Sequence, residues 1–265
     1  MRFLKSAFRK VINGALSPLG LELIPKGSLS SPDVVLPVEL DAYEREVIEY
    51  VLEERLSMCK SLALVNTVKA CRYVVENQIS GDFVECGVWR GGNAILAAKI
   101  FEYLGADRRV WLFDTFSGMT EPTIKDVRLF DGEMATTKYF ETHQGTHTNW
   151  AYSSIDDVRE NMRRANVNMS SVTFVEGDVA QTLREESNLP VSISVLRLDT
   201  DWFESTLLEM KVLYPRVPKG GVLIVDDYGH WRGSKLAVDE YFEQNASKPL
   251  LNVVYNSGTR SAVKI

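Results

Sequence analysis

The stretch DFVECGVWRGGN, residues 82–93, predicts a β-strand, a tight glycine turn and the start of a helix. Residues 82–86 are mostly apolar and stand between two glycines, as a short buried strand should. Gly87, Gly91 and Gly92 let the backbone turn sharply and let a ligand approach the main chain. A unit of strand, glycine turn and helix is where an α/β sheet binds a nucleotide-like ligand.

The spacing of these glycines argues against two common ligand classes. The pattern G-x-x-x-G-G lacks the dinucleotide fingerprint, which argues against an NAD-dependent oxidoreductase. No Gly-Lys-Ser/Thr follows, which argues against a nucleoside triphosphatase. Taken alone, the turn fits either another nucleotide-like ligand or an ordinary structural connection.

Composition limits the protein class further. The 265 residues are enough for one large α/β domain and a small extension, and a 45% hydrophobic fraction is typical of a globular protein. The net charge of -6 argues against a nucleic-acid binder. The three cysteines, Cys59, Cys71 and Cys86, lack metal-type spacing and predict buried thiols in a reducing compartment. We therefore expect a cytoplasmic protein with no nucleic-acid partner.

Residues 1–40 are expected to form an N-terminal amphipathic extension of the main domain, residues 41–265. Basic and apolar residues alternate over residues 1–21, and these charges argue against a signal peptide. No apolar run in the sequence is long enough to cross a bilayer. Such an amphipathic segment packs on a protein or lies on a membrane surface. We expect a homo-oligomer and keep membrane contact as the alternative.

The main domain alternates strands with helices, which predicts a parallel sheet covered on both faces. Strands are expected at 82–86, 109–114, 172–176, 191–199, 221–227, 250–255 and 260–265. Helices are expected at 41–57, 62–76, 94–104, within 149–167, and at 203–214 and 233–245. Asp41 and Glu44 have the spacing of a capping box. Asn256-Ser257-Gly258 predicts a hairpin, which would make the last strand antiparallel.

Residues 115–150 do not fit this alternation. They are polar and rich in Thr, Gly and His. A connection of this length is typically a functional lid or disordered, and this one follows the second strand at the ligand-binding edge of the sheet. We expect a lid, with His143 and His147 as side chains that would reach a substrate.

Acidic residues follow four of the predicted strands, all at one edge of the sheet: Asp114, Asp178, Asp199 with Asp201, and Asp226 with Asp227. These strand ends share one crevice in an open parallel sheet. Clustered carboxylates repel unless a cation or hydrogen bonds compensate them. The edge is therefore a candidate binding site.

The position of each acid suggests a role in ligand binding, and a structural role in a turn or cap is the alternative. Asp114 is placed to accept both ribose hydroxyls, or it caps a turn. Asp178 would accept from an adenine amine, or it belongs to an ordinary Gly-Asp turn. Asp199, Asp226 and Asp227 suit Mg²⁺, a hard cation that prefers oxygen ligands, or they cap the following elements. Zinc fits less well, because neither His nor Cys accompanies them.

Three motifs resemble the macrocin O-methyltransferase-like family: VECGVWRGG at 84–92, LRLDTD at 196–201 followed by EST at 204–206, and VDDYG at 225–229. The resemblance runs from about residue 54 to residue 265. Members of this family are S-adenosylmethionine-dependent, metal-dependent sugar O-methyltransferases of antibiotic biosynthesis. The resemblance implies a Rossmann-like class I methyltransferase fold, with seven strands and the last one antiparallel.

The resemblance also implies roles for individual residues. The magnesium ligands would be Asp199, Asp226 and Asp227. The residues around S-adenosylmethionine would be Met58, Glu85, Gly87, Gly91 and Gly92 at its methionine end, Asp114 and Ser117 at the ribose, and Asp178 at the adenine.

The implied reaction transfers a methyl group to a sugar hydroxyl of a small-molecule glycoside. Mg²⁺ would lower the pKa of that hydroxyl. Related catechol-type enzymes have a lysine three residues after the fourth-strand aspartate, where this chain has Trp202. The base would then be Asp199 itself, with His230 as the second candidate.

Other acceptors and one other function remain open. The lid contains polar residues that favour a sugar: Thr136, Thr137, His143, Gln144, Thr146 and Asn149. A surface-glycan sugar and a catechol or phenolic diol are alternative acceptors. A non-catalytic cofactor-binding subunit is the alternative from another functional class.

Overall fold

The computed structural model describes residues 36–245 and 247–265. The chain divides into two compact units, Met1–Pro37 and Val38–Ile265, and the fold below is that of the second unit. The amphipathic helix expected within residues 1–21 lies outside the described residues, and the domain boundary expected after residue 40 stays a prediction. None of the described helices combines the length and apolar character that a membrane span requires.

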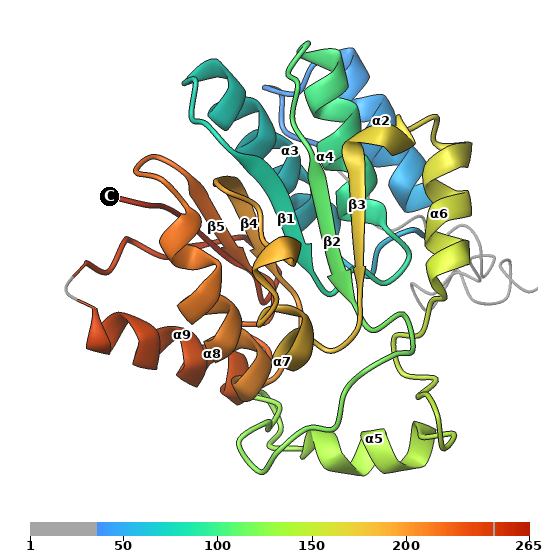
Figure 1. Cartoon of the computed structure of the whole chain (residues 1–265), viewed down its shortest axis with the longest axis vertical. Coiled ribbons are helices and arrows are strands. Elements are labelled where there is room, and N and C mark those ends of the chain that lie inside the picture. The colour runs from blue at the N-terminus through green and yellow to red at the C-terminus, as the bar shows by residue number, and fades with distance from the viewer. Residues whose placement is uncertain (1–35, 246) are drawn as a thin grey trace, which may run out of the picture. The chain divides into compact units, whose positions relative to one another are not determined.

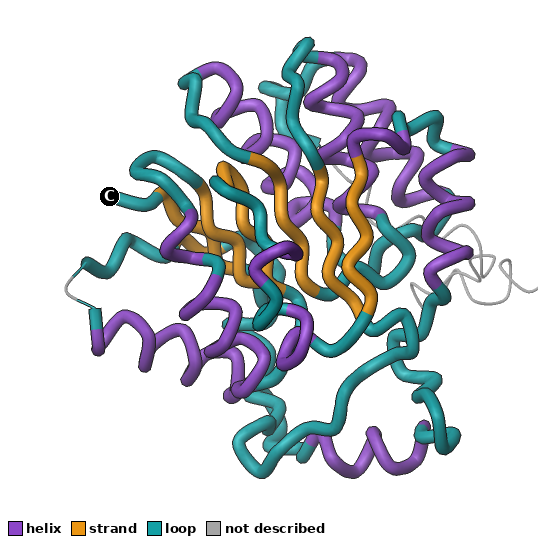
Figure 2. The backbone as a smooth tube through the Cα atoms, viewed as in Figure 1, coloured by secondary structure: helices purple, strands orange, loops and turns teal. Residues whose placement is uncertain are grey.

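Seven strands form one sheet in the order β3-β2-β1-β4-β5-β7-β6 (Figures 1 and 2). Strands β1 to β5 are parallel, and β7 runs antiparallel to both of its neighbours. The strands are β1 (Asp82–Cys86), β2 (Val110–Asp114), β3 (Val172–Glu176), β4 (Ile193–Leu198), β5 (Val222–Val225), β6 (Asn252–Val253) and β7 (Arg260–Val263). The predicted fold class is confirmed.

Helices cover the sheet on both faces (Figure 1). Three helices pack together as one group: α2 (Ala42–Glu53), α3 (Ser61–Glu76) and α4 (Gly92–Tyr103). A second group consists of α7 (Val179–Thr182), α8 (Phe203–Val212) and α9 (Arg232–Gln244). Helix α6 (Ile155–Arg164) precedes β3. The capping box expected at the start of α2 is present. Because helices cover both faces, every residue of β4 is buried.

The turn after β1 brings the ends of two strands together. Gly87 has a φ of +84°, and a Cβ at this position would overlap the carbonyl oxygen of Asp199. The amide of Asp199 donates to the carbonyl of Cys86 at 2.8 Å. The strand order reverses between β1 and β4, the point where open α/β sheets bind ligands.

The start of α4 fixes a second loop at this edge. The amide of Gly92 donates to the carbonyl of Leu56 at 2.9 Å, and a Cβ on Gly92 would lie 2.6 Å from the same oxygen. Residues 57–60 are thereby held beside the glycine turn.

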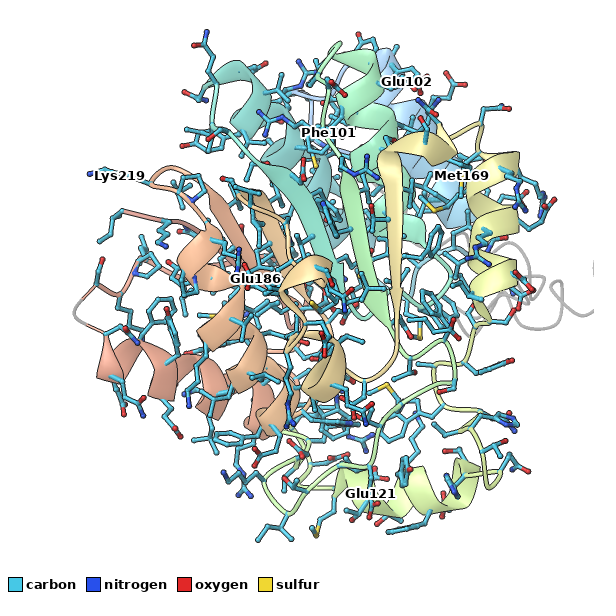
Figure 3. The ribbon with its side chains drawn as sticks, viewed as in Figure 1. Phe101, Glu102, Glu121, Met169, Glu186 and Lys219 are labelled. Carbon is cyan, nitrogen blue, oxygen red and sulfur yellow. The ribbon has the colours of Figure 1, made fainter. Side chains whose placement is uncertain are left out.

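The lid extends beyond the carboxyl end of β2 and contains one helix that the sequence did not indicate, α5 (Ala135–Thr142) (Figures 1 and 3). Its anchor is Asp126, which is completely buried. The Asp126 carboxylate accepts from the amide of Phe203, at the start of α8, at 2.8 Å and from the amide of Thr123 at 2.6 Å. Trp150 packs on Trp202 and Trp231 with ring centroids 5.4 and 6.0 Å away. These buried contacts therefore anchor the lid to the rest of the domain.

Replacing Gly87 with alanine should destabilise the domain by at least about 3 kcal/mol, because the new methyl group meets the backbone of β4 rather than a movable side chain. Gly105→Ala is the matched control: Gly105 also has a positive φ, but open space surrounds it, so its loss should be about 1 kcal/mol. Chemical denaturation measures both. Equal losses would mean that the contact with Asp199 is not the cause.

Replacing Asp126 with alanine should release the lid, because the backbone amides of Phe203 and Thr123 lose a buried charged acceptor. Limited proteolysis should then cut within residues 115–150 at least about tenfold faster, which corresponds to roughly 1.4 kcal/mol. Asp131→Ala, which removes an exposed lid carboxylate paired with Arg128, should leave the cutting rate unchanged. Similar rates in the Asp126 variant and the unmodified protein would contradict the anchoring role.

Candidate functional site

Two cavities open at the carboxyl ends of the strands. The first has an empty volume of about 720 Å³ and is lined by residues that follow β1 to β4 and by the lid. The second, here called the acidic cavity, has an empty volume of about 1790 Å³. Its wall comes from the ends of β1, β4 and β5, the loop before α3, the lid and the hairpin before β7.

The two cavities share part of their wall. Five residues line both: Met58, Trp89, Trp150, Asp199 and Asp201. Two of them are carboxylates that follow β4. A ligand in the first cavity and a ligand in the acidic cavity would therefore meet beside Asp199 and Asp201.

Asp114 lines the first cavity and also holds the glycine turn. Its carboxylate accepts from the amides of Val88 at 2.6 Å, Phe116 at 2.7 Å and Trp89 at 3.2 Å. Burial raises the pKa of Asp114, and these amides act against that rise. The hydrogen bonds are those of a turn cap, while the position in the cavity is the one expected for a ribose contact.

The other residues predicted around the cofactor divide between the cavities. Met58, Gly87 and Asp178 line the first cavity, and Asp178 also caps α7 by accepting from the Ala180 amide at 2.8 Å. Glu85 and Gly92 line the acidic cavity. Two predicted residues line neither: Gly91, which caps α4 with a φ of +87°, and Ser117.

Five carboxyl groups line the acidic cavity: Glu85, Asp199, Asp201, Asp226 and Asp227. Behind this wall lies the guanidinium of Arg197, a β4 residue with 1% exposure. It donates from Nη1 to Glu85 at 2.9 Å and Asp199 at 2.7 Å, and from Nη2 to Asp226 at 2.7 Å. Arg197 thus balances part of the negative charge.

The side chains form two overlapping groups of metal-ligand type. The carboxylates of Asp199, Asp201 and Asp227 offer oxygens within 4.8 Å of one another, and Cys59, Asp199 and Asp226 do the same with a sulfur and two oxygens. The predicted magnesium set is therefore split, since Asp199 and Asp227 share one group and Asp226 lies in the other. The all-oxygen group suits a hard cation.

Burial disfavours charge throughout this cluster. It raises the pKa values of Asp199 and Asp227 well above the ordinary range, although Arg197 acts against the rise at Asp199. Burial, reinforced by the charge of Asp199, raises the pKa of Asp201 to about 8. Burial likewise raises the pKa of Glu85 to about 7. Glu85 Oε2 has no hydrogen-bond partner within the described part of the chain. A bound cation would relieve this repulsion.

His230 lines the acidic cavity and is not one of the residues that line both cavities. Its ring packs on Phe130 and Trp231 at centroid distances of 5.8 and 5.1 Å. Burial lowers the pKa of His230, and the charge of Arg128 lowers it further, so the ring is neutral near pH 7. The lid histidines His143 and His147 line neither cavity.

Sequence reasoning missed two members of this cluster, Cys59 and Arg197, and gave Asp201 no role as a ligand or base. Arg197 carried a readable signal, because an arginine inside an otherwise apolar buried strand requires an acidic partner. The sequence placed Asp201 among the acids at the sheet edge, with a cap of the following element as the alternative. The structure gives it a φ of +67° and places it on the cavity wall.

Comparison with known proteins identifies the family. Residues 30–259 match the family model of the macrocin O-methyltransferases (TylF). The chain is 36% identical over 180 residues to the demethyldecarbamoylnovobiocin O-methyltransferase of Streptomyces niveus, covering 67% of this chain and 64% of that protein. It is 32% identical over 167 residues to the mycinamicin III 3''-O-methyltransferase of Micromonospora griseorubida, covering 62% of each. The alignments thus span just under two thirds of these relatives.

Two solved structures are similar to this protein. The O-methyltransferase NovP superposes with a TM-score of 0.67 at 30% identity, over 79% of this chain and 82% of NovP. The calicheamicin methyltransferase CalS11, at 17% identity and a TM-score of 0.58, shares the fold. Since the family model covers most of the chain and the three motifs of the resemblance lie within the region that it matches, this protein belongs to the macrocin O-methyltransferase (TylF) family.

Proposed function

We propose that this chain transfers a methyl group from S-adenosylmethionine to a sugar hydroxyl of a small-molecule glycoside, with the help of a divalent cation. The observation that carries the proposal is the shared wall, where a cofactor cavity and an acceptor cavity meet at Asp199 and Asp201. The relatives named above are O-methyltransferases of demethyldecarbamoylnovobiocin and of mycinamicin III, which supports a glycosylated natural product as the acceptor. The cytoplasmic location and the homo-oligomeric assembly remain predictions.

The first cavity would take the cofactor. Asp178 and Asp114 lie at the ends of β3 and β2, as expected for adenine and ribose contacts. Met58 and Trp89 line both cavities, where the sulfonium methyl group would have to point toward the acceptor. The lid residues Met119 and Trp150 would exclude water from the reacting atoms.

The acidic cavity would take the acceptor sugar and the cation. Its donor set fits a hard cation, because buried carboxylates without enough compensating charge converge there. Asp199 and Asp227 would hold the cation. The motif resemblance implies both residues, and the convergence of their carboxylate oxygens with those of Asp201 supports this assignment. When bound, Mg²⁺ supplies positive charge that makes a nearby sugar hydroxyl more acidic.

Asp201 would accept the proton of that hydroxyl. It lies on the wall shared by the two cavities, and the charge of a cation bound beside it would keep its carboxylate ionised and able to accept. S-Adenosylmethionine would supply the methyl group, which the hydroxyl oxygen would take from sulfur by in-line displacement. The two cavities would have to hold the cofactor and the acceptor in the correct alignment. His230, the second base predicted from sequence, lines the acidic cavity but not the first cavity.

S-Adenosylhomocysteine should bind with similar affinity in Mg²⁺ and in EDTA, because most of the first cavity lies outside the acidic cluster. Isothermal titration measures both affinities. Asp114→Asn should weaken binding about tenfold, the value of one charge-assisted hydrogen bond. Asp131→Ala, on the exposed lid surface, is the control. Failure of the unmodified protein to bind in either buffer would refute the cofactor assignment.

Asp201→Asn should lower kcat by at least about 100-fold, because the base is lost, while the affinity for S-adenosylhomocysteine stays the same. His230→Gln should keep kcat within about tenfold. A methyltransfer assay on a panel of glycosides, with and without EDTA, measures these rates. Full activity in the Asp201 variant with loss in the His230 variant would move the base to His230. Full activity in EDTA would refute the role of the cation.

A further inference from the structure

Arg197 is a charged residue in the centre of the sheet. It belongs to β4, which is buried along its whole length, and its own exposure is 1%. A buried guanidinium is costly to desolvate unless acceptors surround it with good geometry. Its contacts with the carboxylates of the acidic cavity satisfy this condition. It also contacts the thiol of Cys59, which indicates a further role.

The guanidinium of Arg197 lies against one of the two candidate metal-binding groups, the one formed by Cys59, Asp199 and Asp226. Nη2 lies 3.0 Å from Cys59 Sγ and 2.7 Å from Asp226 Oδ1, and Nη1 lies 2.7 Å from Asp199 Oδ2. These three residues are the ones whose donor atoms converge as a candidate cation site. Arg197 thus lies against every member of that group.

A set of neutral donors keeps this arrangement in place. Thr259 Oγ1 donates to Asp226 Oδ1 at 3.1 Å. Asn93 Nδ2 donates to Cys59 Sγ at 3.6 Å, and the hydroxyl of Thr67 fixes the Asn93 amide at 2.8 Å. The thiol and the Asp226 oxygen are therefore supplied with hydrogen bonds in the absence of any metal.

The other group has no such internal cation. Asp199, Asp201 and Asp227 converge on the acidic cavity, and no arginine or lysine forms an ion pair with Asp201 or Asp227 in the described part of the chain. Only Asp199 belongs to both groups, and one of its oxygens is held by Arg197.

We propose that Arg197 is a positioning residue that acts as a permanent internal cation between Cys59, Asp199 and Asp226, so that the acidic cavity takes up one divalent cation and not two. The inference rests on the cation site of the proposed function. It adds that Arg197 keeps thiophilic metals away from Cys59 and holds the Asp199 carboxylate for the group with Asp201 and Asp227. The planar, multiply donating guanidinium suits this role, because a single ammonium would not reach all the acceptors.

The first test uses the unmodified protein. Titration with Mn²⁺, followed by electron paramagnetic resonance of the free ion, should give one bound cation per chain. Titration with Cd²⁺ should give no thiolate-to-metal absorption that depends on Cys59, as judged against Cys59→Ser. Two Mn²⁺ ions per chain, or a Cys59-dependent Cd²⁺ band, would overturn the inference while leaving the cation site standing. Absence of any Mn²⁺ binding would overturn both.

The second test removes the internal cation. Arg197→Gln should bind a second Mn²⁺ and should show a Cd²⁺–thiolate band that disappears in the Arg197→Gln/Cys59→Ser double variant. Its loss of thermal stability should be restored in part by millimolar Mn²⁺. The control is Arg108→Gln, because Arg108 is an arginine of intermediate burial that donates to the backbone carbonyls of Gly81 and Val74.

A general effect of losing a buried arginine would appear equally in both variants. If the Arg108 variant gains the same binding and rescue, or if the folded Arg197 variant still binds one cation with no band, the inference is wrong. If Arg197→Gln does not fold in either EDTA or Mn²⁺, the Mn²⁺ and Cd²⁺ titrations of the unmodified protein decide the question.

Discussion

The buried guanidinium of Arg197 is the interaction on which the site depends. It joins the end of β1, through Glu85, to the ends of β4 and β5, through Asp199 and Asp226. Carboxylates gathered at one sheet edge repel one another, and their desolvation adds to the cost. One internal cation lets them stay together, and the negative charge that remains would favour the divalent cation that we propose. The same ion pairs therefore serve both folding and the proposed chemistry.

Sheet topology brings these groups into contact. The strand order reverses at the β1–β4 pair, so two strands far apart in the sequence end side by side. Gly87 permits the close approach, because any side chain there would overlap the backbone of Asp199. Glu85 and Arg197 are separated by 112 residues but lie 2.9 Å apart. The glycine turn and the acidic cluster are in this way parts of one structure, and a disturbance at Gly87 would affect both.

The lid gives the two cavities a common wall. Asp126 holds it to the start of α8, and Trp150 packs against Trp202 and Trp231. Trp202 stands where related catechol-type enzymes have a lysine, and here its indole donates to the Thr120 carbonyl at 3.0 Å. The position that would supply a base in those enzymes thus supports the lid in this one. Our proposal therefore assigns proton transfer to the carboxylates that line both cavities, with Asp201 as the proton acceptor.

Local sequence patterns were enough to predict most of the strands and helices and to show which strand ends carry acids. These features depend on local periodicity, glycines and caps, as at residues 82–93 and at Asp41 with Glu44. The helix within the lid was not predicted, because its stability comes from tertiary packing on the tryptophan cluster. Only the tertiary structure decided that Asp226 pairs with Arg197 while Asp201 joins Asp199 and Asp227. The physical reason is that these partnerships depend on ångström-scale distances between side chains from different strands and loops, which residue spacing along the chain does not specify.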